Sequence, residues 1–359
     1  MKTLLFTLEY PPFKGGIANY YGNLVKHWPK PDEIFVLDNN GNKLLSRWLR
    51  PRWLPALFRL YQEIKKKNID HVIVGQILPL GTAIYFIAKF TKTPYTVFVH
   101  GMDIVYAQRT SRKRRLSLKI LRQAKNIICA SHYTAGLVKD FLGEDRSAKI
   151  QVVNPGVDAD YPKNEDLIAA IKKKHRFFNK IVLYSVGRLV KRKGFDKIIE
   201  AMPEILKAVP NLYYFIAGDG PDKRYIYEKA RGVNHVVFLG KPTDEEKWAW
   251  LLSCDIFATV ARNIDGDFEG FGIVYLEAGL AGKPVIAGDS GGTRDAVKNS
   301  YSGILVNPED TERLAGAIIR LAEDKNLRKQ LGEQGRERAI NEFSWGKQVS
   351  RIYHIINNQ

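Results

Sequence analysis

The chain has 359 residues, of which 45% are hydrophobic and 26% are charged, and its formal net charge at pH 7 is +18. This length favours two domains, and the composition is that of a globular protein with a large buried core rather than of a disordered chain. No apolar run reaches the ~18 residues of a membrane-spanning helix. The start of the chain lacks the basic stretch and long apolar run of a signal peptide, so we expect a cytoplasmic protein.

The basic charge is concentrated in the first half of the chain. Residues 1–165 carry 26 basic and 13 acidic side chains, a net charge of +13, whereas the remainder carries 30 and 25, a net charge of +5. This imbalance suggests an anionic partner for the first half.

Short apolar runs alternate with amphipathic segments of helical length, which is typical of parallel α/β sheets. Two successive sets of runs predict two Rossmann-like domains, with ligands at the carboxyl ends of the strands. We place the domains at 1–164 and 165–341, followed by a helical segment over 342–359. Cys129 and Cys254 lie in apolar runs, which predicts buried thiols rather than disulfide or metal chemistry. The predicted strands are 2–8, 33–38, 71–75, 95–100, 126–131 and 150–153, then 181–187, 212–218, 235–239, 256–260, 284–287 and 303–306.

A glycine-containing loop follows the first strand and precedes a predicted helix over 18–28. It reads Glu-Tyr-Pro-Pro-Phe-Lys-Gly-Gly-Ile from Glu9. A plain turn fits this position, but so does a loop in which Gly16 lets a phosphate approach the start of the helix. The loop is not the G-x-G-x-x-G pattern of dinucleotide binding, which disfavours an NAD-dependent enzyme.

Two basic stretches follow, over 43–67 and 109–125, each with eight basic residues, and together they contain one acid. In the first, arginine alternates with tryptophan and leucine, which suggests an interfacial helix on anionic lipid. A nucleic-acid groove would use similar residues, and a solvated basic face is the plain alternative. We favour lipid. The residues expected at the membrane are Arg47, Trp48, Arg50, Arg52 and Trp53.

His100 follows the fourth predicted strand, at the expected ligand edge of the sheet. A single histidine is more often structural than functional, but this position favours contact with a ligand.

The first strand of the second domain leads into a basic loop, Gly-Arg-Leu-Val-Lys-Arg-Lys-Gly from Gly187. Fixed cations at such a place stabilise the negative charge that develops on a departing diphosphate. Arginine offers a planar fork and lysine a point charge. A solvated loop is the alternative.

The stretch from Glu269 to Gly292 predicts a loop, a helix, a turn, a strand and a glycine loop. The helix is expected to begin near Phe271 or Gly272, and its unpaired N–H groups can hold a phosphate. Glu269 precedes the helix and Glu277 lies two turns along it, so the two carboxylates can contact different parts of one elongated ligand.

Two short acidic pairs, Asp158-x-Asp160 and Asp265-x-Asp267, imitate a metal-binding D-x-D. Acidic pairs in loops are usually solvated, and Arg188 and Lys193 already supply the positive charge that a metal would bring. We predict no metal.

These motifs resemble those of the retaining GT-B glycosyltransferases of family four. The pattern G-R-x-x-x-x-K-G is matched fully, and the Glu269–Glu277 stretch is similar to the E-x7-E region of bacterial phosphatidylinositol mannosyltransferases. The resemblance runs from Pro11 through the terminal helix. It implies an α/β protein of GT-B fold, in which two Rossmann-like domains face each other across a cleft and the C-terminal helix crosses back to the first domain.

The resemblance also implies roles for individual residues. Arg188 and Lys193 would bind the diphosphate, Glu269 and His100 the sugar, and Glu277 the ribose hydroxyls. Together these four, Arg188, Lys193, Glu269 and His100, form the expected catalytic set. The residues expected to bind the donor are Gly16, Gly218, Gly240, Lys241, Phe271, Gly272, Ile273, Val274 and Glu277.

The implied reaction is transfer of a hexose from a nucleotide sugar, with retention of configuration and without a cofactor. GDP-mannose is the first expected donor, followed by UDP-glucose and UDP-N-acetylglucosamine. The expected acceptor is lipid-linked or a glycan, reached from the inner face of the cell membrane, with no nucleic-acid partner. A sugar-nucleotide epimerase of the same fold and a non-catalytic nucleic-acid-binding protein are the alternatives.

Overall fold

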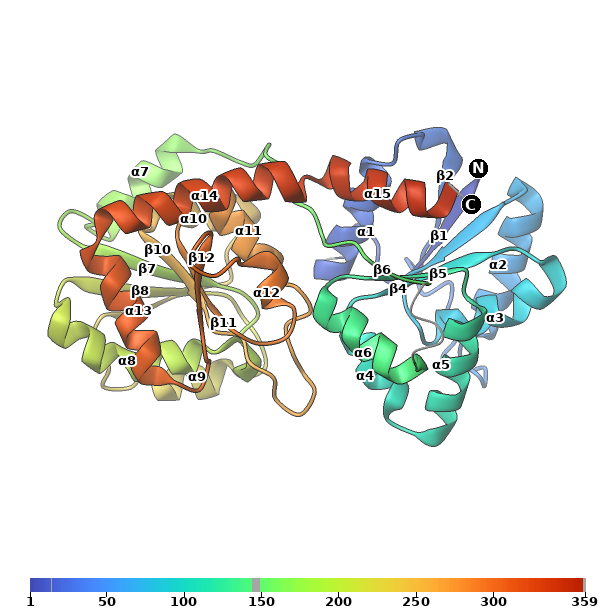
Figure 1. Ribbon diagram of the computed structural model, residues 1–359, viewed down its shortest axis with the longest axis horizontal. Coiled ribbons are helices and arrows are strands. Elements are labelled where there is room, and N and C mark those ends of the chain that lie inside the picture. The colour runs from blue at the N-terminus through green and yellow to red at the C-terminus, as the bar shows by residue number, and fades with distance from the viewer. Residues whose placement is uncertain (14, 144–148, 358–359) are drawn as a thin grey trace. The chain divides into compact units, whose positions relative to one another are not determined.

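The computed structural model describes residues 1–13, 15–143 and 149–357, and the chain divides into two compact α/β units (Figure 1). The first unit comprises residues 1–156 together with the terminal segment from Trp345, and the second comprises residues 157–344. Lys14, in the predicted phosphate-approach loop, lies outside the described residues.

The first unit is built on a six-stranded parallel sheet in the order β2-β1-β3-β4-β5-β6. The six strands expected in the first half of the sequence are thereby confirmed. Their bounds are β1 (Thr3–Phe6), β2 (Ile34–Leu37), β3 (His71–Val74), β4 (Tyr95–Val99), β5 (Asn126–Cys129) and β6 (Ile150–Val152).

Helices cover both faces of this sheet, because alternate residues of each strand point to opposite sides. Val97 and Val99 belong to the core beneath α2, α3 and α5, whereas Phe98 packs against Tyr20 of α1 with ring centroids 6.1 Å apart. The terminal helix α15 lies beside α1. The helices of this unit are α1 (Gly16–Lys26), α2 (Leu54–Lys67), α3 (Leu80–Thr91), α4 (Met102–Gln108), α5 (Ser111–Gln123), α6 (His132–Leu142) and α15 (Trp345–Asn357), with a 3-10 turn at Pro31–Glu33.

The second unit repeats this architecture with a parallel sheet in the order β12-β11-β10-β7-β8-β9. The second set of six predicted strands is confirmed as well. The edge strand β9 begins one residue later than expected, because His235 has a positive φ of 62° and cannot continue an extended strand. The strands are β7 (Ile181–Val186), β8 (Leu212–Ala217), β9 (Val236–Gly240), β10 (Ile256–Thr259), β11 (Val285–Gly288) and β12 (Gly303–Val306).

Two hydrophobic cores lie on the two faces of this second sheet. Tyr184 and Phe257 face one core, whereas Leu183 and Ile256 face the other. The first core is closed mainly by α7, α10, α11 and the end of α14, and the second by α8, α9 and α13. The helices of this unit are α7 (Glu165–Lys174), α8 (Phe195–Ala208), α9 (Lys223–Lys229), α10 (Asp244–Ser253), α11 (Ile273–Leu280), α12 (Thr293–Ala296), α13 (Thr311–Glu323) and α14 (Lys325–Phe343), with a 3-10 turn at Lys191–Lys193.

The units divide after Gly156 and after Ser344, whereas the sequence predicted boundaries after residues 164 and 341. Residues 157–164 belong with the second unit because they form a hydrogen bond and a stacking contact with it. Val157 N–H donates to Phe343 O at 2.7 Å, and Tyr161 stacks on Trp248 with ring centroids 4.2 Å apart. Within the described ranges, no helix combines the length and the apolarity that crossing a membrane requires.

The first basic stretch is only partly helical, which corrects the expectation of an interfacial helix there. Residues 43–53 form turns and bends, and α2 begins at Leu54. Pro51 disfavours helical geometry at Arg50, and Pro55 stands in the first turn of α2, where proline is tolerated. The five predicted membrane residues therefore precede the helix.

Candidate active site

The predicted donor-binding loops of the second unit meet at one edge of its sheet. β10, β7, β8 and β9 are successive neighbours, so the loops that leave their carboxyl ends converge. Gly218 N–H donates to Gly240 O at 2.7 Å, and Arg262 N–H donates to Arg192 O at 2.8 Å. These bonds join loops that lie far apart in the sequence.

Two of the predicted glycines are required by the backbone at this edge. Gly218 has a φ of 147°, and a Cβ there would lie 1.9 Å from Gly187 O. Gly272 has a φ of 90° and precedes α11, where a Cβ would lie 2.4 Å from the ring of Tyr275. The close approach of these loops therefore depends on residues without side chains.

Glu269 is buried and held by two cations from the basic loop. Its Oε2 lies 2.5 Å from Lys193 Nζ and 2.9 Å from Arg192 Nη1. Burial by itself raises the pKa of this carboxyl, but the charges of Lys193 and Arg192 outweigh that effect and lower it. The carboxylate is therefore ionised at neutral pH and fixed in orientation.

Arg192 also bonds to the second acid of the D-x-D sequence, with its Nε 2.9 Å from Asp267 Oδ1. Asp267 is thus part of the ion-pair network around Glu269. Within the described residues, no group of three or more His, Cys, Asp or Glu side chains is placed to hold a metal ion.

The two predicted diphosphate cations differ in their surroundings. Lys193 is buried against Glu269, whereas Arg188 is exposed. In the part of the chain that the structure describes, the Arg188 guanidinium has no hydrogen-bond or ion-pair partner. Lys193 is thus engaged by a carboxylate, and Arg188 is the more accessible of the two cations.

Glu277 lies on α11 and forms an ion pair with α10. Its Oε1 is 2.7 Å from Lys247 Nζ, which also lies 2.9 Å from Asp244 Oδ1. Burial by itself lowers the pKa of Lys247, but the two carboxylates raise it. Lys247 therefore remains charged and orients the carboxylate of Glu277.

The other predicted donor-binding positions differ in their surroundings. Phe271 is buried against Phe343, with ring centroids 5.8 Å apart, so its ring belongs to the core. Ile273 and Val274 open α11, where backbone N–H groups lack helical partners. Lys241 is exposed, after Gly240 with its φ of 76°.

A buried ion pair that the sequence did not reveal supports this edge. Arg262 Nη2 lies 2.7 Å from Asp196 Oδ2, which also accepts from the Tyr225 hydroxyl at 3.1 Å. The sequence also did not indicate that Arg192 pairs with Glu269 or that Lys247 pairs with Glu277. The only local signal for Arg192 was its place beside Lys193, because its partners are distant in the sequence.

In the first unit, His100 lies at the carboxyl end of β4 and is neutral. Burial lowers its pKa to about 4. Its Nε2 is 2.8 Å from the Tyr21 hydroxyl, which donates its proton to Gly75 O. Because that hydroxyl has one proton, His100 Nε2 must be the donor, and Nδ1 keeps a lone pair for a ligand. Gly16, the first residue of α1, is exposed.

The predicted membrane residues are not equivalent. Trp48 is 93% exposed and the three arginines are exposed. Trp53 is half-buried and stacks on Phe86, with ring centroids 5.9 Å apart.

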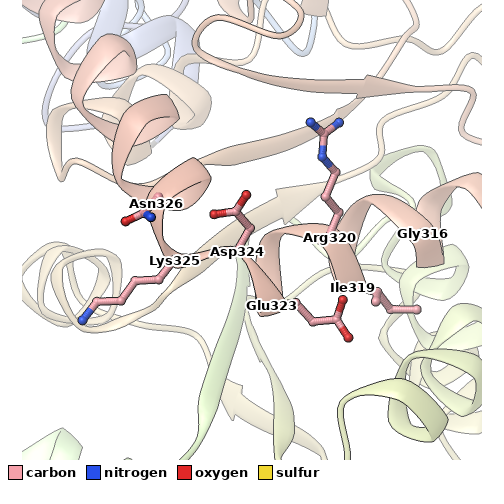
Figure 2. Close-up of a pocket in the computed structure, with 7 residues that line it drawn as sticks. All are labelled: Gly316, Ile319, Arg320, Glu323, Asp324, Lys325 and Asn326. Carbon is pink, nitrogen blue, oxygen red and sulfur yellow. The ribbon is translucent and has the colours of Figure 1, made fainter.

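Figure 2 shows a hollow in the second unit that contains none of the predicted site residues. It lies at the turn between α13 and α14 and is lined by residues that include Arg320, Glu323 and Lys325. Their side chains point in different directions rather than toward one point, so we assign this hollow no part in the chemistry.

Two protein-family models match the chain, one for each unit. Residues 15–161 match Glycosyltransferase Family 4, and residues 168–338 match Glycosyl transferases group 1. The chain is 30% identical to the GDP-mannose-dependent monoacylated alpha-(1-6)-phosphatidylinositol monomannoside mannosyltransferase of Corynebacterium glutamicum, over 100% of this chain and 98% of the relative. It is 27% identical to the GDP-mannose-dependent alpha-(1-6)-phosphatidylinositol monomannoside mannosyltransferase of Mycolicibacterium smegmatis, over 99% and 98%.

Solved structures agree with the predicted fold. Anabaena HepE in complex with UDP superposes with a TM-score of 0.83 at 20% identity, over the whole of both chains. Sucrose-phosphate synthase of Thermosynechococcus elongatus gives a TM-score of 0.81 at 18% identity, over 100% of this chain and 99% of that one. At these identities the likeness concerns the fold, which is GT-B. With a relative this similar along its whole length and both family models matched, the chain belongs to the family 4 glycosyltransferases.

Proposed function

We propose that this glycosyltransferase moves mannose from GDP-mannose to a lipid-linked acceptor, with retention of configuration and without a metal. The observation that carries the proposal is that the anchored Glu269 and the exposed Arg188 lie in loops at the same edge of the second sheet. A fixed carboxylate suits sugar hydroxyls, and an available guanidinium suits a diphosphate. The choice of mannose and of a lipid acceptor rests on the full-length relatives, whose names specify GDP-mannose and phosphatidylinositol mannosides.

The proposed reaction exchanges substituents on one face of the sugar. The bond from the anomeric carbon to the diphosphate oxygen breaks as the bond to the acceptor oxygen forms. The acceptor proton passes to the departing phosphate. Arg188 and Lys193 stabilise the charge on that phosphate, where positive charge helps most in the transition state. Glu269 and His100 hold the sugar, Glu277 holds the ribose, and the amides of Gly16 and Ile273 contact phosphate oxygens.

A UDP-sugar donor is the second candidate. HepE, which has the same fold, was solved with UDP and with UDP-glucose. The loop at Gly240 and Lys241 is proposed to contact the base through backbone groups, and such contacts leave no side-chain code for guanine or uracil.

Incubation with GDP-mannose, UDP-glucose and UDP-N-acetylglucosamine, each with and without phosphatidylinositol mannoside, tests the proposal. We expect release of GDP that depends on the acceptor, and an α-linked product in its NMR spectrum. Release of UDP instead would assign the second donor. Conversion of the nucleotide sugar without an acceptor would indicate an epimerase, and no turnover of any donor would refute the proposal.

We also propose that the protein works as a peripheral protein on the inner face of the cell membrane. The basic first half of the chain supports this location, since the cytoplasmic leaflet carries anionic lipid. Cell fractionation that leaves the protein in the soluble fraction at low salt would refute it.

A further inference from the structure

Exposed hydrophobic side chains gather on two neighbouring helices of the first unit. In the described part of the chain, seven of the thirteen exposed large hydrophobic residues lie on α2, on α3 or in the segment that precedes α2. Phe90 is 81% exposed and Phe58 is 61% exposed. We call these seven residues the aromatic face: Trp48, Leu49, Leu54, Phe58, Tyr61, Phe86 and Phe90.

Helical spacing explains why these side chains point away from the core. Leu54, Phe58 and Tyr61 stand at positions i, i+4 and i+7 of α2 and form one stripe, apart from the residues that the helix buries. Phe86 and Phe90 are one turn apart on α3. The two helices pack against each other (Figure 1), and Trp53 stacks on Phe86 to join the start of α2 to α3.

The surroundings of the aromatic face are strongly basic. The one acid on either helix, Glu63, is bound to Lys67 at 2.8 Å and is half-buried. It therefore does little to offset the nearby cations. The exposed basic residues of this region are Lys43, Arg47, Arg50, Arg52, Arg59, Lys65, Lys66, Lys89 and Lys92.

We propose that the aromatic face is the surface by which the enzyme docks on an anionic lipid bilayer. An apolar stripe among cations matches the acyl boundary and the headgroups of such a surface. A nucleic acid would match the cations and could stack on the aromatic rings, but Leu49 and Leu54 offer bases no ring and extend the apolar surface, which favours the acyl boundary of a bilayer. The inference builds on the proposed lipid-linked acceptor, because docking brings the first unit to the layer that holds such an acceptor.

This surface differs from the one that the sequence indicates. Trp53 is only half-exposed, because its ring stacks on Phe86. On α2 and α3, outside the arginine–tryptophan segment, Phe58 and Phe90 are the most exposed of the aromatic side chains and add to Trp48 as rings available for insertion.

Co-flotation with vesicles, without donor or acceptor, tests the surface. The vesicles contain phosphatidylglycerol and phosphatidylcholine, or phosphatidylcholine alone. We expect the double substitution Phe58→Ser, Phe90→Ser to lower binding to the anionic vesicles by about tenfold or more, as loss of two inserted rings should. Phe178→Ser is the matched control, because Phe178 is 87% exposed on the second unit, and it should bind like the wild type.

A second pair of variants tests the charge. Arg50→Gln with Arg59→Gln should reduce the preference for phosphatidylglycerol, whereas Arg231→Gln with Arg336→Gln, exposed on the second unit, should leave it unchanged.

Several outcomes would contradict docking through the aromatic face. They are a wild type that does not float, a Phe58/Phe90 variant that floats like the wild type, and a dimer that this variant dissociates in sedimentation velocity. Sugar transfer to a detergent-dispersed acceptor is measured beside flotation. Sugar transfer without flotation contradicts only the proposed docking surface, and flotation without sugar transfer contradicts only the proposed reaction.

Discussion

Arg192 and Glu269 lie 77 positions apart in the chain, yet Arg192 Nη1 donates to Glu269 Oε2 at 2.9 Å. The same guanidinium reaches Asp267, and the Arg192 carbonyl accepts from Arg262 N–H. Arg192 therefore ties the basic loop after β7 to the loop after β10. The carboxylate proposed to hold the sugar is positioned by a residue that itself needs no contact with the donor.

Substitution Arg192→Gln should weaken binding of the nucleotide sugar while leaving free nucleotide binding nearly unchanged. We expect kcat/KM to fall by about tenfold or more, since a charged hydrogen bond that orients a buried group is worth roughly 1.5–3 kcal/mol. Titration calorimetry with GDP and with GDP-mannose separates the two effects. Lys191→Gln, an exposed change in the same turn, is the control, and equal losses for both ligands would contradict the positioning role.

Substitutions of Arg188 and Lys193 should both lower turnover by about 10²-fold or more, as loss of a charge stabiliser does. They should differ in stability. Arg188→Ala removes an exposed side chain and should leave Tm unchanged, whereas Lys193→Ala removes a buried partner of Glu269 and should lower Tm. Near wild-type rates for both folded variants would show that the leaving-group assignment is wrong.

Glu277→Gln should raise the KM for the donor more than it lowers kcat, because a ribose contact is made in the ground state and the transition state alike. The change also deprives Lys247 of its ion-pair partner. Asp244→Asn removes the other partner of Lys247 and controls for that effect. An unchanged KM with a collapsed kcat would reverse the roles of the two glutamates.

The stabilising effect of Glu269 should depend on pH. Its pKa is lowered in the folded protein, so its ion pairs stabilise the fold above the ordinary glutamate pKa of about 4.3 and lose this effect as the pH falls through the lowered value. The Tm difference between wild type and Glu269→Gln should therefore be present at neutral pH and shrink in acid. A difference that stays constant down to strongly acidic pH would contradict this linkage.

Chelation with EDTA should leave the transfer rate unchanged, because Asp267 is engaged by Arg192 and cations already stand at the proposed leaving-group site. The rate is measured before and after dialysis. Activity that disappears and returns only with Mg²⁺ or Mn²⁺ would restore the metal-binding interpretation of the D-x-D sequence.

Local pattern alone determined the architecture of this protein. Buried parallel strands are continuous apolar runs, so each run marks a strand, and alternation with helices implies parallel order. The positions of Arg188 and Gly218 at the ends of such runs placed them at one sheet edge, and Glu269 stands before the helix that follows a third run. What the pattern could not supply is which side chains of that edge meet.

Only the tertiary structure decided those pairings. Arg192 meets Glu269 because β7 and β10 are neighbours in the sheet, and neighbours in a sheet need not be neighbours in the chain. Lys247 meets Glu277 because α10 and α11 each bring a charged residue to the same place. Trp48 and Trp53 look alike in the sequence, but only the packing of α3 beneath the start of α2 makes one exposed and the other half-buried. Such contacts depend on distances between segments remote in the chain, about which residue order within one segment carries no information.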